Sequence, residues 1–194
     1  MPATGALTPG WPPTEGTLCM TYRSTPMAGP PPLRKVTANV LTPLGWLHGT
    51  FNVPPHQSLV DFLGPGIQVI KFTRVRLPNA TKTIPFVGLR RESVSVIEPT
   101  LSDDMVESPG SAGRTAPHEV SCLFPHGELR GTLEVLVNVR VSDFLRQQAS
   151  LLVLRRCIYA PYNEPEDSPR ARQLLTAVVN LANAIGLAEW ESPD

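Results

Sequence analysis

The chain has 194 residues, of which 41% are hydrophobic, and its 17 Lys and Arg balance 17 Asp and Glu. The zero formal net charge gives no overall attraction to nucleic acid or to an anionic membrane, and the length suits one large domain or two small ones. The 22 prolines and 14 glycines indicate many turns and few long helices.

Three cysteines without a CxxC pair are typical of buried, reduced thiols. The chain contains no apolar run long enough to span a membrane and no signal-peptide pattern at its start. These features predict a soluble cytoplasmic protein.

Residues 1–33 form a proline-rich leader. Because proline neither continues a helix nor donates to a sheet, we expect this leader to be largely disordered or to lie on a neighbour as an extended arm. From residue 34 to residue 99 the sequence becomes β-rich. The expected elements are a hairpin over 36–41 and 46–53, a helical turn over 58–63, a strand over 67–77, and two strands over 85–98 that are bent at 90–92.

Residues 100–118 are polar and non-periodic, which predicts a linker. Residues 119–194 then follow the order of the first unit, with an expanded loop at 160–172. The expected elements are a hairpin over 120–124 and 128–137, a helical turn over 141–148, a strand over 151–159, and a closing stretch over 174–189. That closing stretch is alanine-rich and fits a helix on propensity alone, but its correspondence with the first unit favours strands.

The two units share an order because the chain repeats itself. Residues 41–63 and 123–145 match at 10 of 23 positions, at an offset of 82 and without a gap. A repeat predicts two copies of one structural unit. Since a unit of about 66 residues buries only about 60% of its unfolded surface, we expect the copies to pack together as a pseudo-twofold pair.

Several repeated residues have an expected structural role in a turn, a close approach or a helix cap. They are Gly45, Gly49, Asp61, Gly127, Gly131 and Asp143. The glycines within strands indicate a bend or a close backbone approach. Asp61 and Asp143 are expected to begin a helical turn and accept from its free N–H groups; contact with a ligand or partner is the alternative.

The segments Gly-Trp-Leu-His-Gly-Thr-Phe at 45–51 and Leu-Arg-Arg-Glu-Ser-Val-Ser-Val-Ile at 89–97 resemble the Sm-like family. The repeat is also similar to bacterial domains of unknown function with a G-x-L-x-G…S-D-F-L signature. The resemblance implies a mainly β fold made of two tandem, bent, five-stranded Sm-like barrels, each with one short helical turn. RNA-binding Sm proteins hold a base with an Asp-x-Φ-x-Asn loop, which has no counterpart at 60–64, and the Arg-Gly pair of the family is Arg90-Arg91 here.

No catalytic or metal-binding motif is present in the sequence. The four histidines lack partners at ligand spacing, and the acidic pairs lie in proline-flanked loops where water solvates them. We therefore expect a protein that is not an enzyme and that needs no cofactor or metal.

Charge is unevenly divided between the repeats. Residues 34–99 carry eight Lys and Arg against three Asp and Glu, or +5, whereas residues 119–194 carry seven against ten, or −3. A basic unit joined to an acidic one can bind its own kind head to tail, or the two can neutralise each other within one chain. The candidate binding face comprises Lys71, Arg74, Arg76, Lys82, Arg90 and Arg91. Because these residues alternate with apolar ones, an ordinary solvated sheet face is the favoured explanation and a binding face is the alternative.

These observations favour a non-catalytic protein-interaction module, either a scaffold or an accessory subunit of a larger bacterial assembly. The expected partner is another protein or a second copy of the chain; no membrane partner or small-molecule substrate is evident. The alternative is an Sm-like nucleic-acid-binding protein that acts through the basic first repeat.

Overall fold

The computed structural model describes residues 32–100, 106, 113–147, 150–163 and 171–190. Almost all of the expected leader at 1–33, much of the linker at 100–118 and the middle of the loop at 160–172 lie outside these residues. Pro31–Asp194 form one compact unit that contains both repeats.

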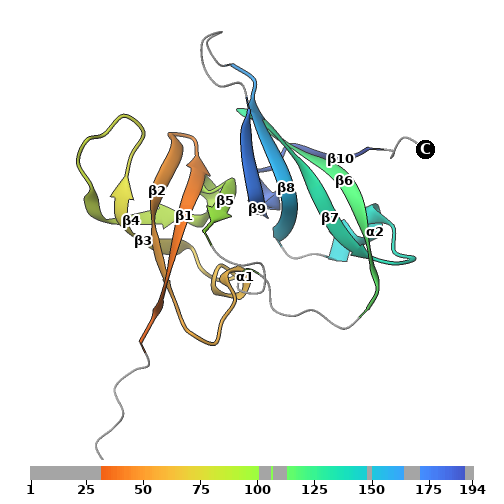
Figure 1. Ribbon diagram of the computed structural model, residues 1–194, viewed down its shortest axis with the longest axis horizontal. Helices are drawn as coiled ribbons and strands as arrows, with labels where there is room; N and C mark the ends of the chain where they lie inside the picture. The colour runs from red at the N-terminus through yellow and green to blue at the C-terminus, as the bar shows by residue number, and fades with distance from the viewer. Residues whose placement is uncertain (1–31, 101–105, 107–112, 148–149, 164–170, 191–194) are drawn as a thin grey trace, which may run out of the picture. The chain divides into compact units, whose positions relative to one another are not determined.

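Both repeats run through the same elements, which are strand, strand, α-helix, strand, strand, 3₁₀ turn and strand (Figure 1). The first repeat contains β1 (Arg34–Thr42), β2 (Gly45–Val53), α1 (Leu59–Phe62), β3 (Val69–Arg76), β4 (Ile84–Arg90), η1 (Arg91–Ser93) and β5 (Val96–Pro99). The second contains β6 (Thr115–Phe124), β7 (Gly127–Leu136), α2 (Val141–Gln147), β8 (Leu151–Pro161), β9 (Arg172–Asn180), η3 (Leu181–Asn183) and β10 (Gly186–Glu189). β9 and β10 confirm strands in the alanine-rich stretch.

The strands form where apolar residues alternate. In β2, Leu47, Gly49, Phe51 and Val53 are buried on one face while the residues between them are partly exposed. One boundary differs from the prediction, because β6 begins at Thr115 inside the expected linker. Its hairpin with β7 stays in register to the very end of β7, and this pairing extends the strand.

The strands form one open antiparallel sheet of ten in the order β10-β6-β7-β8-β9-β5-β1-β2-β3-β4. This confirms the expected mainly β fold. Each repeat supplies five neighbouring strands, which lie in the order fifth, first, second, third, fourth. The two repeats are therefore joined by pairing of their strands as well as by the chain.

The joint between the repeats is head to tail, so the expected pseudo-twofold pairing is wrong. The fifth strand of the first repeat, β5, pairs with the fourth strand of the second, β9, with Val96 opposite Val179 and Ile97 opposite Val178 (Figure 1). A twofold axis would pair like strands with each other. The physical reason is that any open edge strand can pair with any other, so the similarity of the two repeats does not determine which of their edges meet.

Two buried clusters form the core, and each crosses the joint. The cluster of the first repeat includes Val153 and Val178 from the second, and the cluster of the second includes Leu41 and Val96 from the first. Each fully buried side chain of this size contributes about 1.5–3 kcal/mol. Sharing of apolar surface, which was expected of such small units, is thus achieved through the head-to-tail joint.

None of the helices in the described part of the chain is long and apolar enough to cross a membrane.

Candidate functional site

The six basic residues of the candidate face do not gather around one point. All except Arg91 have exposed side chains. The Nζ of Lys71 lies 5.8 Å from the centre of the Phe86 ring, and Lys82 lies in the loop between β3 and β4. The other four line two hollows, Arg74 and Arg76 in one and Arg90 and Arg91 in the other.

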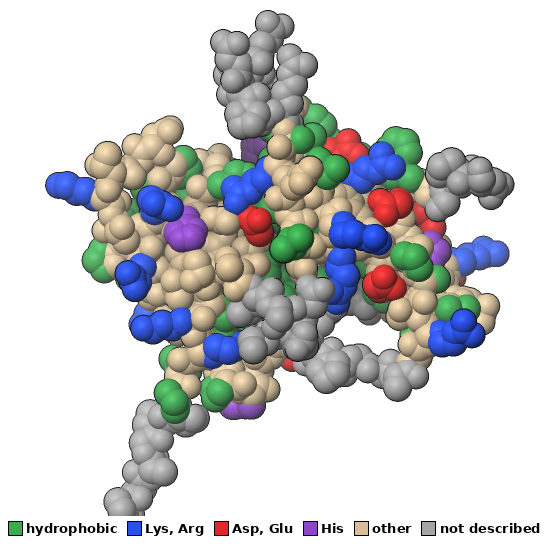
Figure 2. Space-filling view, viewed as in Figure 1, with side chains coloured by type: hydrophobic (Ala, Val, Ile, Leu, Met, Phe, Trp, Pro, Cys, Tyr) green, Lys and Arg blue, Asp and Glu red, His purple; other side chains and the backbone are tan. Residues whose placement is uncertain are grey.

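The uneven charge of the sequence is visible on the surface. Figure 2 shows Lys and Arg side chains on both repeats, whereas the Asp and Glu side chains visible in this view lie toward the joint and the second repeat. The described residues of the first repeat carry the whole excess of +5, whereas those of the second carry six Arg against five Asp and Glu, because its other five acidic residues lie at 164–167 and 191–194, outside the described part.

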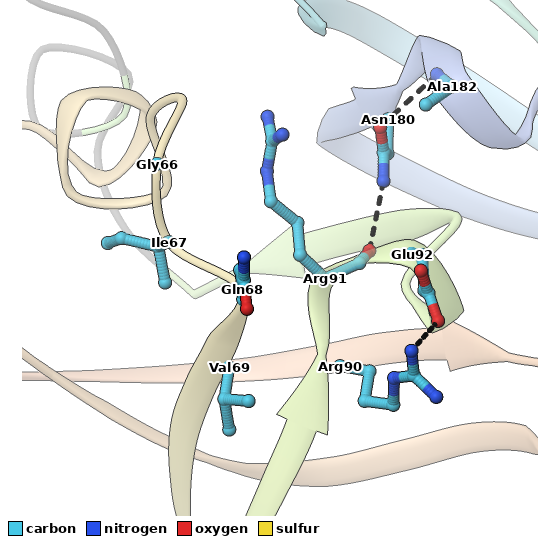
Figure 3. Close-up of a pocket in the computed structure, with 9 residues that line it drawn as sticks. All are labelled: Gly66, Ile67, Gln68, Val69, Arg90, Arg91, Glu92, Asn180 and Ala182. Carbon is cyan, nitrogen blue, oxygen red and sulfur yellow. Dashed lines mark hydrogen bonds and ion pairs between the residues drawn. The ribbon is translucent and has the colours of Figure 1, made fainter.

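The larger hollow, of about 550 Å³, lies where η1 meets η3, and we call it the joint hollow (Figure 3). Its lining comprises Gly66, Ile67, Gln68, Val69, Arg90, Arg91, Glu92, Asn180 and Ala182. Both repeats thus contribute to it. The first repeat supplies most of the wall and all of the charged groups.

Arg91 is already occupied in holding the two repeats together. Its guanidinium donates to the Ser150 hydroxyl, and its backbone carbonyl accepts from Asn180 Nδ2 at 3.0 Å (Figure 3). Its Nε is buried and has no hydrogen-bond partner among the described residues. We therefore assign Arg91 primarily to the joint.

Arg90 differs from its neighbour in both direction and partner. The two side chains leave the backbone on opposite sides, and Arg90 forms an ion pair with Glu92 (Figure 3). Both members of the pair are well exposed, so the pair adds little stability. The guanidinium of Arg90 is thus available to a carbonyl or carboxylate that approaches from outside.

The smaller hollow, of about 350 Å³, lies over β2 and β3, and we call it the β3 hollow. Its lining comprises Thr37, His48, Gly49, Thr50, Arg74, Arg76 and Thr83. His48 Nδ1 is 3.0 Å from Asn39 Oδ1, which fixes the orientation of the imidazole ring. Two arginines and a histidine beside hydroxyl groups make an arrangement that suits an anion such as a phosphate.

A bulge underlies the β3 hollow and recurs in the second repeat. The pairing of β2 with β3 shifts register at Gly49, and that of β7 with β8 shifts at Gly131. A Cβ on Gly49 would lie 2.7 Å from the Phe72 ring. Opposite each shift an arginine adopts positive φ, Arg74 at 53° and Arg156 at 49°. The sequence indicated the repeated glycines, and it placed Arg74 in the candidate basic face. It did not indicate that Arg74 and Arg156 are equivalent residues at the two bulges.

The other repeated glycines lie at the hairpin turns for different reasons. Gly45 has φ of 95°, a conformation that favours glycine. At Gly127 an added Cβ would approach Ala160 O to 2.6 Å. The same repeat position is therefore glycine for two reasons: Gly45 needs the positive φ, and Gly127 leaves no room for a side chain.

The cap of α1 is Ser58, so the expected cap role of Asp61 needs correction. The Ser58 hydroxyl accepts from the backbone N–H of Asp61 at 3.0 Å and donates to the Asp61 carboxylate at 2.6 Å. Asp61 therefore lies inside the first turn, where its carboxylate supports the cap. The sequence signal was present as Ser58 three residues before an acidic residue.

Asp143 also lies inside its helix. Its backbone N–H donates to Arg140 O at 3.0 Å, and its carboxylate lies 3.6 Å from the guanidinium of Arg146. Arg140 occupies the position that Ser58 has in the first repeat. The second repeat thus lacks the serine cap, and its helix is longer.

Two cysteines lie in the core of the second repeat. Burial raises the pKa of the Cys122 thiol to about 12 and, helped by the nearby Cys122, that of Cys157 to about 12. Thiols of such high pKa are poor nucleophiles. Among the described residues, no group of three His, Cys, Asp or Glu side chains is placed to hold a metal ion.

The residues that sequence reasoning missed are those of the joint. Asn180 Nδ2 donates to Arg91 O and to Val94 O, each at 3.0 Å. Arg172 donates to Glu98 at 2.5 Å and stacks over the Trp46 ring at 4.5 Å. No motif marks these residues, since each acts across a separation of more than 70 positions or between the two repeats.

In comparisons with known proteins, no family model, curated protein or solved structure gives a significant match to this chain.

Proposed function

We propose that this chain is a non-catalytic protein-interaction module, acting as a scaffold or as an accessory subunit of a larger assembly. One observation carries the proposal. Both terminal strands of the sheet have an edge without a neighbouring strand among the described residues. Large apolar side chains are exposed beside these edges, Val69 and Phe86 near β4 and Ile185 and Trp190 near β10. An open edge with exposed apolar residues is a template for another chain.

Each five-stranded block is, in this proposal, a strongly bent Sm-like unit. Three features support it: the strand order within each block, the 3₁₀ turn before each fifth strand, and the bulge at Gly49 and Gly131 that bends the second and third strands. The fold on its own implies no activity.

Binding of nucleic acid is the second candidate, and the β3 hollow is the observation in its favour. Arg74, Arg76 and His48 converge there on a face that is positive overall. Against it, Arg91 is held by Ser150, and the exposed carboxylate of Glu92 beside Arg90 would repel a phosphate. We therefore rank a protein partner first.

The test is recovery of the full chain from its native cell, followed by a salt titration of whatever is recovered with it. Phosphate contacts release counterions, so a nucleic-acid complex should lose affinity with a log–log slope of about −0.7 per contact on single strands. A protein interface of backbone pairing and apolar contacts should be much less steep. Arg74→Ala/Arg76→Ala tests the β3 hollow, and Arg155→Ala/Arg156→Ala in the second repeat is the matched control.

Recovery of one protein in a fixed ratio, whether a different protein or the same chain, with no dependence on Arg74 and Arg76, supports the proposal. Recovery of RNA or DNA that is shed at moderate salt and lost in Arg74→Ala/Arg76→Ala alone contradicts it and establishes the second candidate.

A further inference from the structure

Each repeat has two edges, formed by its fourth and its fifth strand. The internal joint pairs the fifth strand of one repeat with the fourth strand of the other, which leaves one fourth strand and one fifth strand unpaired at the ends of the sheet. β5, a fifth strand, pairs with β9, a fourth strand. The ends of the ten-stranded sheet are therefore β4, the other fourth strand, and β10, the other fifth strand. The surfaces that meet once inside the chain are both present again at its two ends.

The free edges match the joined ones residue by residue. Asn180 lies opposite Leu151 in the second repeat as Arg90 lies opposite Val69 in the first. Each immediately precedes a three-residue 3₁₀ turn and has an extended backbone, with φ, ψ of −89°, 104° at Asn180 and −68°, 129° at Arg90. Arg90 is thus the backbone counterpart of Asn180.

The fifth strands correspond in the same way. Val96 lies opposite Leu41 in β1, and Gly186 lies opposite Leu123 in β6, which is the repeat position of Leu41. The N–H of Ser95 donates to Leu41 O, and that of Ile185 donates to Leu123 O. Ile185 is therefore the counterpart of Ser95, whose carbonyl accepts from the N–H of Asn180 at 2.9 Å.

We infer that β10 of one copy of this chain pairs with β4 of the next, in the register of the internal joint. Leu187 then lies opposite Gly88, Gly186 lies opposite Leu89, and the N–H of Arg90 donates to Ile185 O. The inference rests on the proposed function and names its partner as a second copy of the chain. Head-to-tail contacts of this kind build rings or filaments, not closed dimers.

The side chains at the free edges make this contact more polar than the internal one. Val178, buried in the joint, corresponds to Gly88, and Val153 corresponds to the exposed Lys71. Part of the lost apolar burial is offset by local charge, since the β4 end carries the exposed Lys71 and Arg90 and the β10 end carries the exposed Glu189. We therefore expect a weaker contact than the internal joint, favoured by low salt.

Arg90 has a defined task in this arrangement. Its counterpart Asn180 donates from Nδ2 to the carbonyls of Arg91 and Val94 beside η1. The corresponding carbonyls beside η3 are those of Leu181 and Ala184. The exposed guanidinium of Arg90 is suited to donate to both, and the exposed ion pair with Glu92 is cheaply given up.

The test uses the purified full chain and sedimentation velocity over a range of concentrations at low and high salt. The wild type should form species larger than a dimer at low salt. Arg90→Glu blocks the β4 end by placing a carboxylate against carbonyls, and Ile185→Lys blocks the β10 end by placing a cation beside Arg90. Each should weaken association by about tenfold or more, since like groups across an interface cost several kcal/mol.

The decisive measurement mixes Ile185→Lys with Phe86→Glu, which blocks the β4 end by placing a carboxylate opposite Glu189 of β10. Arg90→Glu is not used in the mixture, because its carboxylate would pair with the new ammonium group at position 185. Each retains one intact end, so the mixture should form a one-to-one dimer and nothing larger, while each variant alone stays monomeric. The matched controls are Arg76→Glu and Leu175→Lys, which make the same charge changes at exposed positions away from the free edges and should assemble as the wild type does. If Arg90→Glu fails to fold by circular dichroism, Phe86→Glu replaces it on β4 in the single-variant measurements as well.

A wild type that stays monomeric at low salt, a mixture without a dimer, or controls that fail equally would overturn the inference. Capture of a different protein in a fixed ratio by a monomeric chain would overturn it and leave the proposed function standing. Recovery of nucleic acid through Arg74 and Arg76 would instead remove the proposed function.

Discussion

The two repeats have the same order of elements but differ where each meets a neighbour. In β9, Val178 and Asn180 are buried in the joint; in β4, the same positions are the exposed Gly88 and Arg90. The fold of a repeat therefore does not require an apolar residue or an amide at these positions. Their chemistry follows from what the edge contacts.

The bulged third strands differ in the same manner. The first repeat places Arg76 beside its bulge, and the second places Ile158, 45% exposed, near Leu175, 88% exposed. One backbone arrangement thus carries a basic surface in one repeat and an apolar surface in the other. Matched substitutions at corresponding positions separate what the fold needs from what the surroundings need.

The largest difference is expected for Val178→Asp against Gly88→Asp. An unpaired carboxylate buried in the joint should lower the free energy of unfolding by about 4 kcal/mol or more. An exposed one on β4, whose Cβ would lie 3.1 Å from Cγ1 of the exposed Val69, should lower it by less than about 1 kcal/mol. Chemical denaturation at high salt, where copies do not associate, measures both. Equal losses would show that β4 is covered and would break the comparison.

Asn180→Ala against Arg90→Ala should give the next largest difference. Removing the amide leaves the carbonyls of Arg91 and Val94 with one partner fewer, at a cost of about 1–3 kcal/mol. Arg90→Ala removes only an exposed ion pair and should cost less than about 1 kcal/mol. A stable Asn180→Ala protein would mean that the amide is not needed to hold the joint.

The contrast also explains how far the sequence could predict the structure. Buried positions such as Leu47, Phe51 and Val53 can be predicted from the alternation of apolar and polar residues, because a strand with one buried face has a period of two. The repeat added the order of the elements and indicated strands over residues 174–189. Local pattern was therefore sufficient for the strands of each repeat.

The joint could not be predicted, because pairing between repeats leaves no local trace. In the sequence nothing distinguishes Asn180 from other polar residues, and nothing indicates that Trp46 and Arg172 lie in contact. The twofold expectation failed since similarity of two units does not say which of their edges meet. The candidate basic face likewise separated into two hollows when side-chain directions along β3 and β4 became known.

The buried thiols should add a pH dependence to stability that comes from the second repeat. Cys122 and Cys157 occupy the positions of Val40 and Val75 in the first repeat. Their folded pKa values of about 12 lie above the usual value of 9.0, so the folded state disfavours ionisation. Stability is full below pH 9 and should fall as pH rises toward 12, by about 1 kcal/mol per thiol and pH unit.

Cys122→Val/Cys157→Val is the matched control, because it makes the second repeat like the first at both positions. Unfolding by urea between pH 8 and pH 10.5 should show a smaller loss for this variant than for the wild type. Parallel curves would mean that the thiols are not buried. Alkylation of Cys122 and Cys157 in the native protein by iodoacetamide at pH 8, followed on their own peptides by mass spectrometry, should also be slow until denaturant is added.

The smallest difference is expected between Ser58→Ala and Arg140→Ala, which occupy the same repeat position before α1 and α2. Ser58 caps α1 with its hydroxyl and holds the Asp61 carboxylate at 2.6 Å, so its loss should lower the free energy of unfolding by about 0.5–2 kcal/mol. Arg140 is exposed and contributes only backbone bonds to α2, so its side chain should matter by less than about 0.5 kcal/mol. Urea midpoints of the two variants, measured beside the wild type, give the answer. Equal effects would show that the Ser58 hydroxyl adds no stability to α1 beyond what Arg140 gives α2.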